Sequence, residues 1–338
     1  MIYGEELGAG GISTKTIPPQ GLNLTLKGGN GKIDCTFTGI TSEWLYLGQY
    51  YRLIAKPGSA PTSPMDGVQI KDVQVGAIGD AVISASIEGL TNGVQYYVRL
   101  YVRGENGWQT SIDAVGAATP VAGIALSTIA ASDAATEQII MLPEQGVPVK
   151  FLLLKHNYEN SGRSLVLRKD LYDSRPYKSI PASNAYATSE IDAWFNGDYF
   201  NLIDEAVQNK ISEVSFPYTP GKGNNVVTTL SRKIFALSYT ELGASGSSYA
   251  KVEGTAIAYF NSNNRRIGYL SGTAIRWWTR SPSTFNPNAA WTVYPSGSVE
   301  NPTESNYSFG SRPAFTLPAD MLFNPEPNPD GSYSPLAA

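Results

Sequence analysis

The sequence predicts a mainly β protein of two domains, a β-sandwich followed by a domain that combines helices with small sheets (α+β). Three observations support this prediction. The chain has 338 residues, which is long for a single domain. It is rich in turn formers and aromatic residues, with 33 glycines, 22 prolines and 20 tyrosines, and only 16% of its residues are charged. Alternating apolar and polar residues fill the N-terminal part, whereas clear helical spacing appears only over residues 187–211.

Residues 1–20 contain glycine and proline but few apolar side chains, so we expect an attachment arm there. From residue 21 to residue 119 short strands follow one another. Ile33, Cys35 and Phe37 alternate with polar residues, and the preceding "GGNG" predicts a hairpin turn. The segments "YYRLIAKPG", "DAVISASIEGL" and "QYYVRLYVRG" predict further strands. Short strands at this spacing are typical of a β-sandwich.

One motif refines this prediction. Tyr96 follows Leu90 across a glycine-containing turn. The pattern resembles the tyrosine corner of fibronectin type III domains, in which the leucine packs in the core and the tyrosine hydroxyl bonds back to the backbone. The hairpin sequence that follows is also similar to that family. The resemblance implies a fibronectin III-like β-sandwich over residues 21–119, a fold that serves many functions.

Residues 120–145 are rich in Ala, Ser and Thr, and they predict a linker or a short helix. The sequence leaves open whether the apolar side chains of this segment pack between copies of the chain or on the neighbouring domains. These side chains are Ile124, Leu126, Ile129, Ile139 and Ile140. At the other end of the second domain, residues 321–338 predict a proline-rich tail.

The second domain is expected over residues 146–320. Two strands, "VPVKFLLLKHNY" and "RSLVLRKDLYD", open it. Ser189 and Asp192 then predict a capped helix start, and Gly197 predicts the helix end. A second helix is predicted from the spacing of Phe200, Ile203, Val207 and Ile211. Short strands, "GTAIAYF" among them, and long loops complete an α+β domain.

The order of motifs in this domain is distinctive. The segments "DAWFNGDYFNLI", "RKIFALSYTELG", "WWTRSP", "YPSGSV" and "YSFGSRPAFTLP" resemble a C-type-lectin-like domain of phage and prophage tail proteins from Gram-positive bacteria. In that family the domain often follows a fibronectin type III domain. The layout is also similar to the variable proteins of diversity-generating retroelements. That similarity implies a variable surface over residues 283–308, followed by a closing strand over 309–315.

The residues themselves indicate the same place. If "IRWWTRSP" is a strand, Trp277 and Trp278 point to opposite faces, so one can fill the core while the other supports a loop. We expect Arg280 and Arg312 to be buried hydrogen-bonding forks that tie down long loops, rather than ligand contacts.

Aromatic and amide side chains on loops make adaptable contacts at low entropic cost, as in antibody paratopes. We therefore expect a receptor-binding surface after Arg280. The alternative is a set of ordinary surface turns with Trp291 in the core. The predicted binding residues are Thr284, Phe285, Asn286, Asn288, Trp291, Asn301, Thr303, Glu304, Asn306 and Tyr307.

Several kinds of chemistry are disfavoured. One cysteine, Cys35, and one histidine, His156, exclude a disulfide within the chain and a Cys/His zinc site, and both are expected to be structural. The net charge of −4 argues against nucleic-acid binding. The tripeptide Glu326–Asn328 matches one that C-type lectins use for calcium-dependent sugar binding, but it lies in the expected tail. We expect no metal, no cofactor and no catalytic residue, since nucleophile-elbow and zincin motifs are absent.

These expectations combine into one hypothesis. Both domain types are extracellular recognition modules, yet the sequence shows no secretion signal and no membrane helix. A virion protein fits, because it is assembled in the host cytoplasm and acts outside. We expect a phage tail fibre or receptor-binding protein, or its counterpart in a tail-like bacteriocin. The N-terminus would join other tail or baseplate proteins, and the family resemblance implies a homotrimer.

The expected receptor is a glycan or a protein on a bacterial cell surface. Two alternatives remain open. One is a structural baseplate or capsid-decoration protein without a receptor, and the other is an enzyme that hydrolyses surface glycans.

Overall fold

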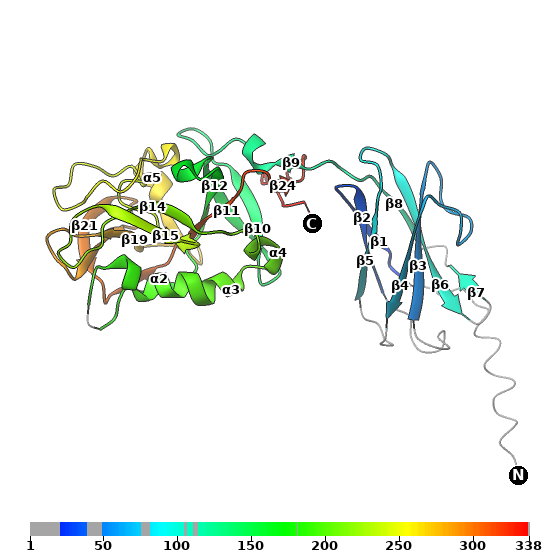
Figure 1. The fold of residues 1–338 in the computed structure, drawn as a ribbon, viewed down its shortest axis with the longest axis horizontal. Coiled ribbons are helices and arrows are strands. Elements are labelled where there is room, and N and C mark those ends of the chain that lie inside the picture. The colour runs from blue at the N-terminus through cyan, green and yellow to red at the C-terminus, as the bar shows by residue number, and fades with distance from the viewer. Residues whose placement is uncertain are drawn as a thin grey trace, which may run out of the picture. The chain divides into compact units, whose positions relative to one another are not determined.

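The computed structural model describes residues 21–38, 49–75, 82–104, 107–110, 114–180 and 182–336. The chain divides into two compact units (Figure 1). Unit 1 spans Met1–Gly123 with Leu336–Ala338, and unit 2 spans Ile124–Pro335. Strands predominate, and the described helices all belong to unit 2, so the predicted mainly β class is confirmed. The arm expected over residues 1–20 lies outside the described residues.

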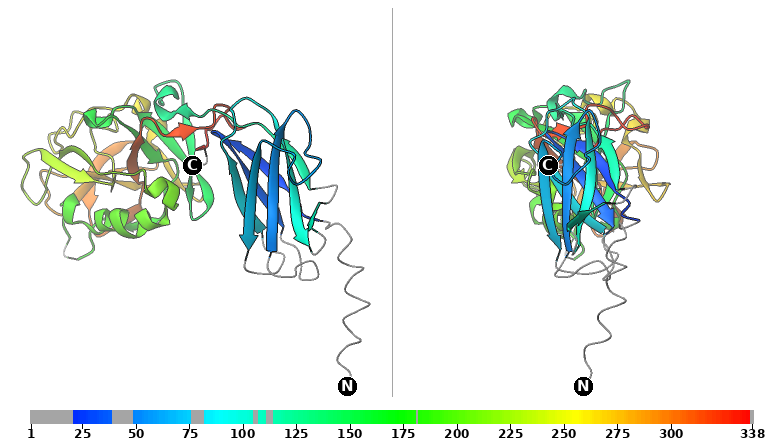
Figure 2. Two further views of the ribbon diagram at one scale, coloured as in Figure 1. Left: turned by 45° about the vertical axis from the view of Figure 1, so that its right-hand side comes forward. Right: turned by 90° about the vertical axis from the view of Figure 1, so that its right-hand side faces the viewer.

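The described part of unit 1 contains two antiparallel sheets, whose strands run along the unit (Figure 2). The first sheet has the order β1 (Thr25–Gly29), β2 (Lys32–Thr38), β5 (Val82–Glu88). The second has the order β4 (Gln69–Val75), β3 (Gln49–Pro57), β6 (Tyr96–Gly104), β7 (Gly107–Gln109), and β8 (Val115–Ala118) also pairs with β6.

Both sheets face one core. Alternation along β2 turns Ile33, Cys35 and Phe37 inward, where they meet residues of β3 such as Tyr51. The rings of Phe37 and Tyr51 lie 4.9 Å apart. Burial raises the pKa of the Cys35 thiol to about 12, as for a thiol that serves only as a small apolar side chain. The predicted structural role of Cys35 is confirmed.

The predicted corner contact is also present in unit 1. Leu90 is buried in the core, and the backbone N–H of Thr91 donates to the hydroxyl of Tyr96 at 3.2 Å. The hydroxyl thus ties the turn before β6 to the strand itself.

Unit 2 contains two five-stranded sheets that share one core. The first, which is antiparallel, has the order β10 (Ile139–Glu144), β11 (Val147–Lys155), β12 (Arg163–Arg168), β23 (Ala314–Pro318), β16 (Ile234–Phe235). The second has the order β13 (Ser174–Pro176), β22 (Ser308–Gly310), β19 (Trp277–Pro282), β20 (Ala289–Val293), β21 (Val299–Glu304).

Three two-stranded sheets complete the strands of unit 2. They pair β14 (Val214–Tyr218) with β15 (Thr228–Arg232), β17 (Gly268–Leu270) with β18 (Thr273–Ile275), and β24 (Leu322–Phe323) with β9 (Ile124–Ala125). Short helices stand between the strands: η2 (Leu126–Thr128), η3 (Tyr158–Asn160), η4 (Tyr186–Thr188), η6 (Ala258–Phe260) and α5 (Asn263–Arg266). The segment "GTAIAYF", expected as a strand, ends in η6 instead.

The longest helical segment begins as predicted. It comprises α2 (Glu190–Trp194), the π-helical turn η5 (Phe195–Tyr199) and α3 (Phe200–Leu202), and it runs along one side of unit 2 (Figure 1). The Ser189 hydroxyl accepts a hydrogen bond from the Asp192 backbone N–H at 3.1 Å, so the predicted helix cap is confirmed.

The predicted helix end at Gly197 is wrong. Gly197 lies inside η5, because continuing the helix buries both Phe195 and Tyr199. The predicted second helix is interrupted at Ile203, whose backbone is extended, and it resumes as α4 (Glu205–Gln208). The Gln208 side chain donates to the carbonyls of Phe200 and Ile203 at 2.8 and 3.1 Å, which joins α4 to the end of α3 across the break.

The expected linker over residues 120–145 is wrong from Ile124 onward, because this stretch is part of unit 2. Its β10 pairs with β11 through six residue pairs, and Leu126, Ile129 and Ile140 lie in the core of unit 2. The apolar side chains that could have packed between copies of the chain therefore pack within their own unit.

The expected tail is also integrated as far as residue 335. Phe323 of β24 is fully buried, and Tyr333 exchanges backbone hydrogen bonds with Ile139 and Met141 at 3.0 and 2.8 Å. Among the described residues no helix is long and apolar enough to cross a membrane.

Candidate binding surface

The structure brings two groups of the predicted binding residues together. Residues 284–288 lie in the loop between β19 and β20, and residues 304–307 comprise the last residue of β21 and the turn that leads to β22. The register of β20 and β21 places Ala289 opposite Glu304. The backbone N–H of Ser305 then donates to the Asn288 carbonyl at 2.8 Å. We call residues 284–288 and 304–307 the loop surface.

A single buried side chain holds the loop from beneath. Asn184 is fully buried, and its amide nitrogen lies 2.9, 3.0 and 3.1 Å from the carbonyl oxygens of Ser283, Asn286 and Ala289. Its amide oxygen accepts from the backbone N–H of Lys222 at 2.8 Å. One side chain therefore fixes both ends and the middle of the loop backbone.

The surroundings of Asn184 leave no spare room. Gly221 has a positive φ of 78°, and a Cβ at this position would lie 2.7 Å from the Asn184 amide oxygen. Glycine is therefore required at position 221 both by its backbone conformation and by the close approach.

Ser305 anchors the second half of the loop surface. This residue is fully buried, and its hydroxyl accepts from the backbone N–H of Ser183 at 2.8 Å. Its carbonyl accepts from the backbone N–H of Lys178 at 3.0 Å. Within the loop itself the hydroxyl of Ser283 accepts from the backbone N–H groups of Phe285 and Asn286. The backbone of the loop surface is thus held by contacts that do not use its exposed side chains.

Most side chains of the loop surface point into solvent. Phe285 is 77% exposed and Tyr307 is 57% exposed. Asn288, Glu304 and Asn306 are exposed as well. Three predicted residues are half-buried: Thr284, Asn286 and Thr303.

Trp291 does not belong to the loop surface. It is buried, its ring lies 4.5 Å from that of Tyr239, and its indole N–H donates to the Tyr249 carbonyl at 3.3 Å. Its prediction as a binding residue is therefore wrong, and its position in β20 explains why, because that strand is buried at every residue. Asn301 lies in β21, and its side chain is outside the described part of the structure.

The structure adds one residue that the sequence did not indicate. Tyr249 is 49% exposed, and its ring lies 5.4 Å from that of Phe285. Its carbonyl also accepts from the backbone N–H of Thr284 at 2.9 Å. The only sequence signal was a tyrosine in the glycine- and serine-rich stretch "ASGSSYAK".

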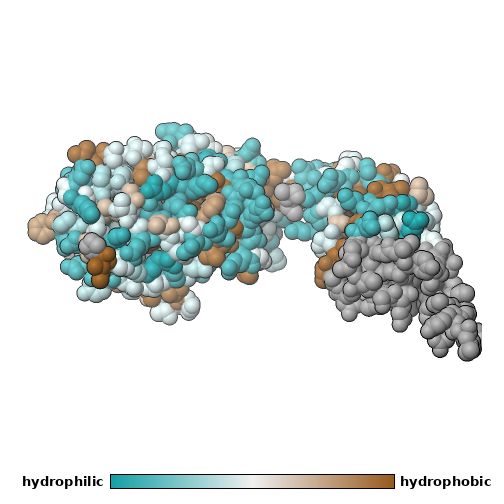
Figure 3. All heavy atoms as spheres, turned by 60° about the horizontal axis from the view of Figure 1, so that its bottom comes forward, coloured by the Kyte–Doolittle hydropathy of each residue, from teal (hydrophilic) through white to brown (hydrophobic). Residues whose placement is uncertain are grey.

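On the face shown in Figure 3, apolar residues form small separate patches among hydrophilic ones.

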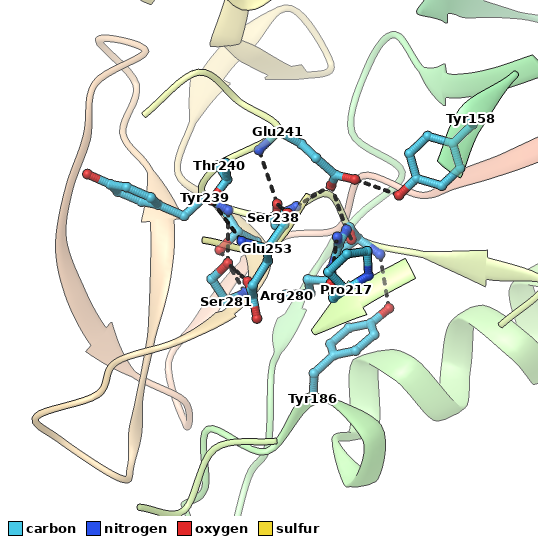
Figure 4. A network of polar contacts seen from close by, with 12 residues as sticks. Tyr158, Tyr186, Pro217, Ser238, Tyr239, Thr240, Glu241, Glu253, Arg280 and Ser281 are labelled. Atoms are coloured by element: carbon cyan, nitrogen blue, oxygen red, sulfur yellow. Dashed lines mark hydrogen bonds and ion pairs between the residues drawn. The ribbon is translucent and has the colours of Figure 1, made fainter. Parts of the chain in front are cut away.

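A buried polar network surrounds Arg280 of β19, the strand that precedes the loop 284–288 (Figure 4). Arg280 is fully buried and donates to the Glu241 carboxylate at 2.6 Å and to the carbonyls of Ala236 and Pro217. The Tyr158 hydroxyl donates to the same carboxylate at 2.5 Å. Burial alone would lower the pKa of Arg280, but the Glu241 carboxylate outweighs it and raises that pKa.

The predicted roles of both arginine forks are confirmed. Arg312 is buried and donates to the carbonyls of Arg168 and Lys169 at 3.0 and 2.6 Å. Burial without a carboxylate partner lowers the pKa of Arg312 to about 10. Trp277 and Trp278 are fully buried too, so this tryptophan pair belongs to the core of unit 2 and not to the loop surface.

Glu253 connects this network to the start of the loop. Its carboxylate accepts from the backbone N–H of Thr219 at 2.5 Å and from the hydroxyl of Ser281. Because Glu253 is fully buried, desolvation raises its pKa. The Ser281 hydroxyl in turn accepts from the backbone N–H of Tyr239 at 2.9 Å. The two buried glutamates thus join β19 to the segment 238–254.

The single histidine has a structural environment. The Nε2 of His156 lies 2.8 Å from the carbonyl oxygen of Ile129, so this nitrogen carries the proton. Its Nδ1 lies 2.8 Å from the hydroxyl oxygen of Ser164. Ser164 is fully buried, which makes it unsuitable as a nucleophile for an external substrate.

A second feature of unit 2 is a groove of about 410 Å³. Its charged lining residues include Lys150 and Arg168, which are paired with Asp330 and Glu144 respectively. In the described ranges no three His, Cys, Asp or Glu residues gather in a way that could hold a metal ion.

Comparison with known proteins gives one family match. Residues 161–319 match the model of a family described as a domain of unknown function (DUF6273). The matched stretch runs from just before β12 to just after β23. It therefore contains the whole loop surface and the buried network except Tyr158. No curated protein and no solved structure matches this chain.

Proposed function

We propose that this chain is a phage tail fibre or receptor-binding protein that recognises a bacterial cell-surface receptor through the loop surface. One observation carries the proposal: exposed aromatic, amide and carboxylate side chains stand on a backbone that Asn184 and Ser305 hold in place. A preorganised backbone lowers the entropic cost of binding, and rigid aromatic side chains bury much area per rotatable bond.

The resemblances stated for the sequence are part of the proposal. Support for a fibronectin III-like unit 1 comes from its division into a three-stranded and a larger sheet around one core, and from the hydrogen bond between Thr91 and Tyr96. Support for a C-type-lectin-like unit 2 comes from β23, which lies beside β12 and so joins the end of the domain to its beginning. Long loops and short strands fill the sequence between them.

We further propose that the protein is part of a virion. The protein would be assembled in the host cytoplasm and placed at the tail tip of the virion. Its N-terminal residues would join the tail or baseplate. A homotrimer would present several loop surfaces at once, so weak individual sites would give strong attachment through avidity. The receptor would be a glycan or a protein.

The test measures binding of the labelled full-length chain to intact cells of a panel of Gram-positive bacteria. The double variant Phe285→Ala with Tyr307→Ala removes the two exposed aromatic rings of the loop surface. Tyr269→Ala is the matched control, because Tyr269 of β17 is also exposed but lies outside the loop surface. We expect saturable binding by the parent and the control.

The double variant should bind at least tenfold more weakly, since each aromatic anchor contributes about 2 kcal/mol when it is central to an interface. Undiminished binding by a folded double variant would overturn the assignment of the loop surface. Absence of binding to all cells by the assembled parent would favour a structural baseplate protein, whereas release of soluble sugar from cell walls would favour the hydrolase.

A further inference from the structure

Arg276 differs from the other arginines of unit 2. Among the described residues its guanidinium has no hydrogen-bond partner and no ion-pair partner, and its Nε is shielded from solvent. Every other arginine of unit 2 donates hydrogen bonds to a carboxylate or to other oxygen atoms of the protein. These paired arginines are Arg163, Arg168, Arg175, Arg232, Arg265, Arg266, Arg280 and Arg312.

Two aromatic rings flank this unpaired guanidinium. Its central carbon lies 3.6 Å from the ring centroid of Tyr294 and 5.0 Å from that of Phe309. Trp277 pairs with Val293, so Arg276 and Tyr294 are the next cross-strand neighbours in the same register. On the other side the backbone N–H of Gly310 donates to the Arg276 carbonyl at 2.8 Å. Backbone pairing on both sides therefore fixes the two rings around the charge.

The arrangement leaves the charge of Arg276 uncompensated. Arg276 is half-buried, and burial is the sole cause that lowers its pKa. A guanidinium nevertheless remains protonated at neutral pH. Contacts with ring faces stabilise the cation but use only the faces of the guanidinium plane. They leave its in-plane N–H groups, the donors that bind oxyanions in a bidentate fashion, without a protein acceptor.

We propose that Arg276 is an oxyanion-binding position, which takes a carboxylate, sulfate or phosphate group of a ligand on its in-plane N–H groups while Tyr294 and Phe309 hold the guanidinium plane. Phe309 also stacks on Tyr307 of the loop surface at 6.1 Å, so the position adjoins that surface. The proposal does not depend on the receptor-binding function, because it concerns the binding of a simple anion.

The test uses the full-length chain with ¹⁵N-labelled arginine and follows the side-chain Nε–H signals by NMR. Sodium sulfate, sodium phosphate and sodium acetate are titrated separately at constant ionic strength, with chloride as the balancing anion. We expect the Arg276 signal to shift saturably with at least one of the three oxyanions. Acetate represents carboxylate ligands, and sulfate and phosphate represent the tetrahedral ones, so the three arms identify the preferred class.

An internal control is provided by Arg175. Its guanidinium lies 3.3 Å from the Trp194 ring centroid, but it is already paired with Asp173, so its signal should not respond. In uniformly ¹⁵N-labelled protein, the backbone N–H signals of the neighbouring Tyr294 and Phe309 should also shift saturably, and Arg276→Gln should abolish this response. Lys210→Gln removes the same charge from an exposed side chain after α4 and should retain that response.

Arg276→Lys keeps the charge but lacks the planar fork, so it should respond more weakly than the parent. This variant also serves if Arg276→Gln does not fold. The proposal is overturned if no oxyanion shifts the Arg276 signal, or if that signal only drifts linearly and in parallel with that of Arg175.

Discussion

At the scale of single residues, the loop surface depends on side chains that a ligand would never touch. Asn184 and Ser305 contact backbone atoms, whereas Phe285 and Tyr307 are largely exposed to solvent. The sequence indicated the exposed residues because aromatic and amide side chains cluster there. It did not indicate Asn184, because the carbonyls that it binds lie 99 to 105 positions later in the chain.

Asn184→Asp should destabilise unit 2 by about 3 kcal/mol, because the carboxylate cannot donate to the three loop carbonyls and is desolvated without a cation. The free energy of unfolding, measured with urea, checks this. Asn306→Asp makes the same chemical change at an exposed position and should alter that free energy by less than about 0.5 kcal/mol. Equal effects of the two substitutions would show that Asn184 does not hold the loop.

Glu253 should make stability depend on pH. Burial raises its folded-state pKa above the unfolded value, so the folded state retains a proton that the unfolded state has lost. Its contribution to stability is therefore complete below the unfolded pKa and declines as the pH rises through the folded pKa. Glu253→Gln cannot lose a proton.

We therefore expect the free energy of unfolding of Glu253→Gln, relative to the parent, to increase from acidic to neutral pH. Urea unfolding at a series of pH values measures this difference. A difference that is constant across the series, or that decreases with pH, would contradict the expectation.

At the scale of elements, the sequence predicted those helices and strands that depend on interactions between residues close in sequence. The strand β2 and the helix cap at Ser189 could both be predicted, because each depends on residues close in sequence. The predicted helix end at Gly197 is wrong because burial of Phe195 and Tyr199 outweighs the tendency of glycine to end a helix. The place of the segment 124–145 in unit 2 could not be predicted for a different reason, since its strand β9 pairs with β24 near the other end of unit 2.

The Ser189 cap gives a prediction for one element. Ser189→Ala removes the acceptor for the Asp192 backbone N–H and should lower the free energy of unfolding of unit 2 by about 1 kcal/mol. Ser212→Ala is the control, because Ser212 is exposed and precedes β14 outside any helix. Chemical denaturation followed by tryptophan fluorescence measures both, and a loss of equal size in the control would refute the capping role.

At the scale of the whole molecule, the described residues form two hydrophobic cores with no residue in common. The cores are built differently. That of unit 1 lies between two sheets, whereas that of unit 2 joins both five-stranded sheets to the helical segment. Overall class and the existence of two units could be predicted from composition and periodicity, but the border at Gly123 could not, because it depends on pairings distant in sequence.

Separate cores predict separate responses to mutation. Phe37→Ala in unit 1 and Phe151→Ala in unit 2 each delete a fully buried ring, which costs about 3–5 kcal/mol. Differential scanning calorimetry should show each substitution lowering a different thermal transition and leaving the other in place. One common transition that moves with both variants would show that the units unfold as a single cooperative body.

The way in which Asn184 holds the loop has a practical consequence. Its amide contacts the loop only through main-chain carbonyls, which every amino acid supplies, so this support does not depend on the side chains of the loop. Exposed residues such as Phe285, Asn288 and Asn306 can therefore be substituted without loss of the contacts that hold the loop backbone. Substitutions at these exposed positions should therefore change the chemistry of the surface while the backbone of the loop keeps its conformation.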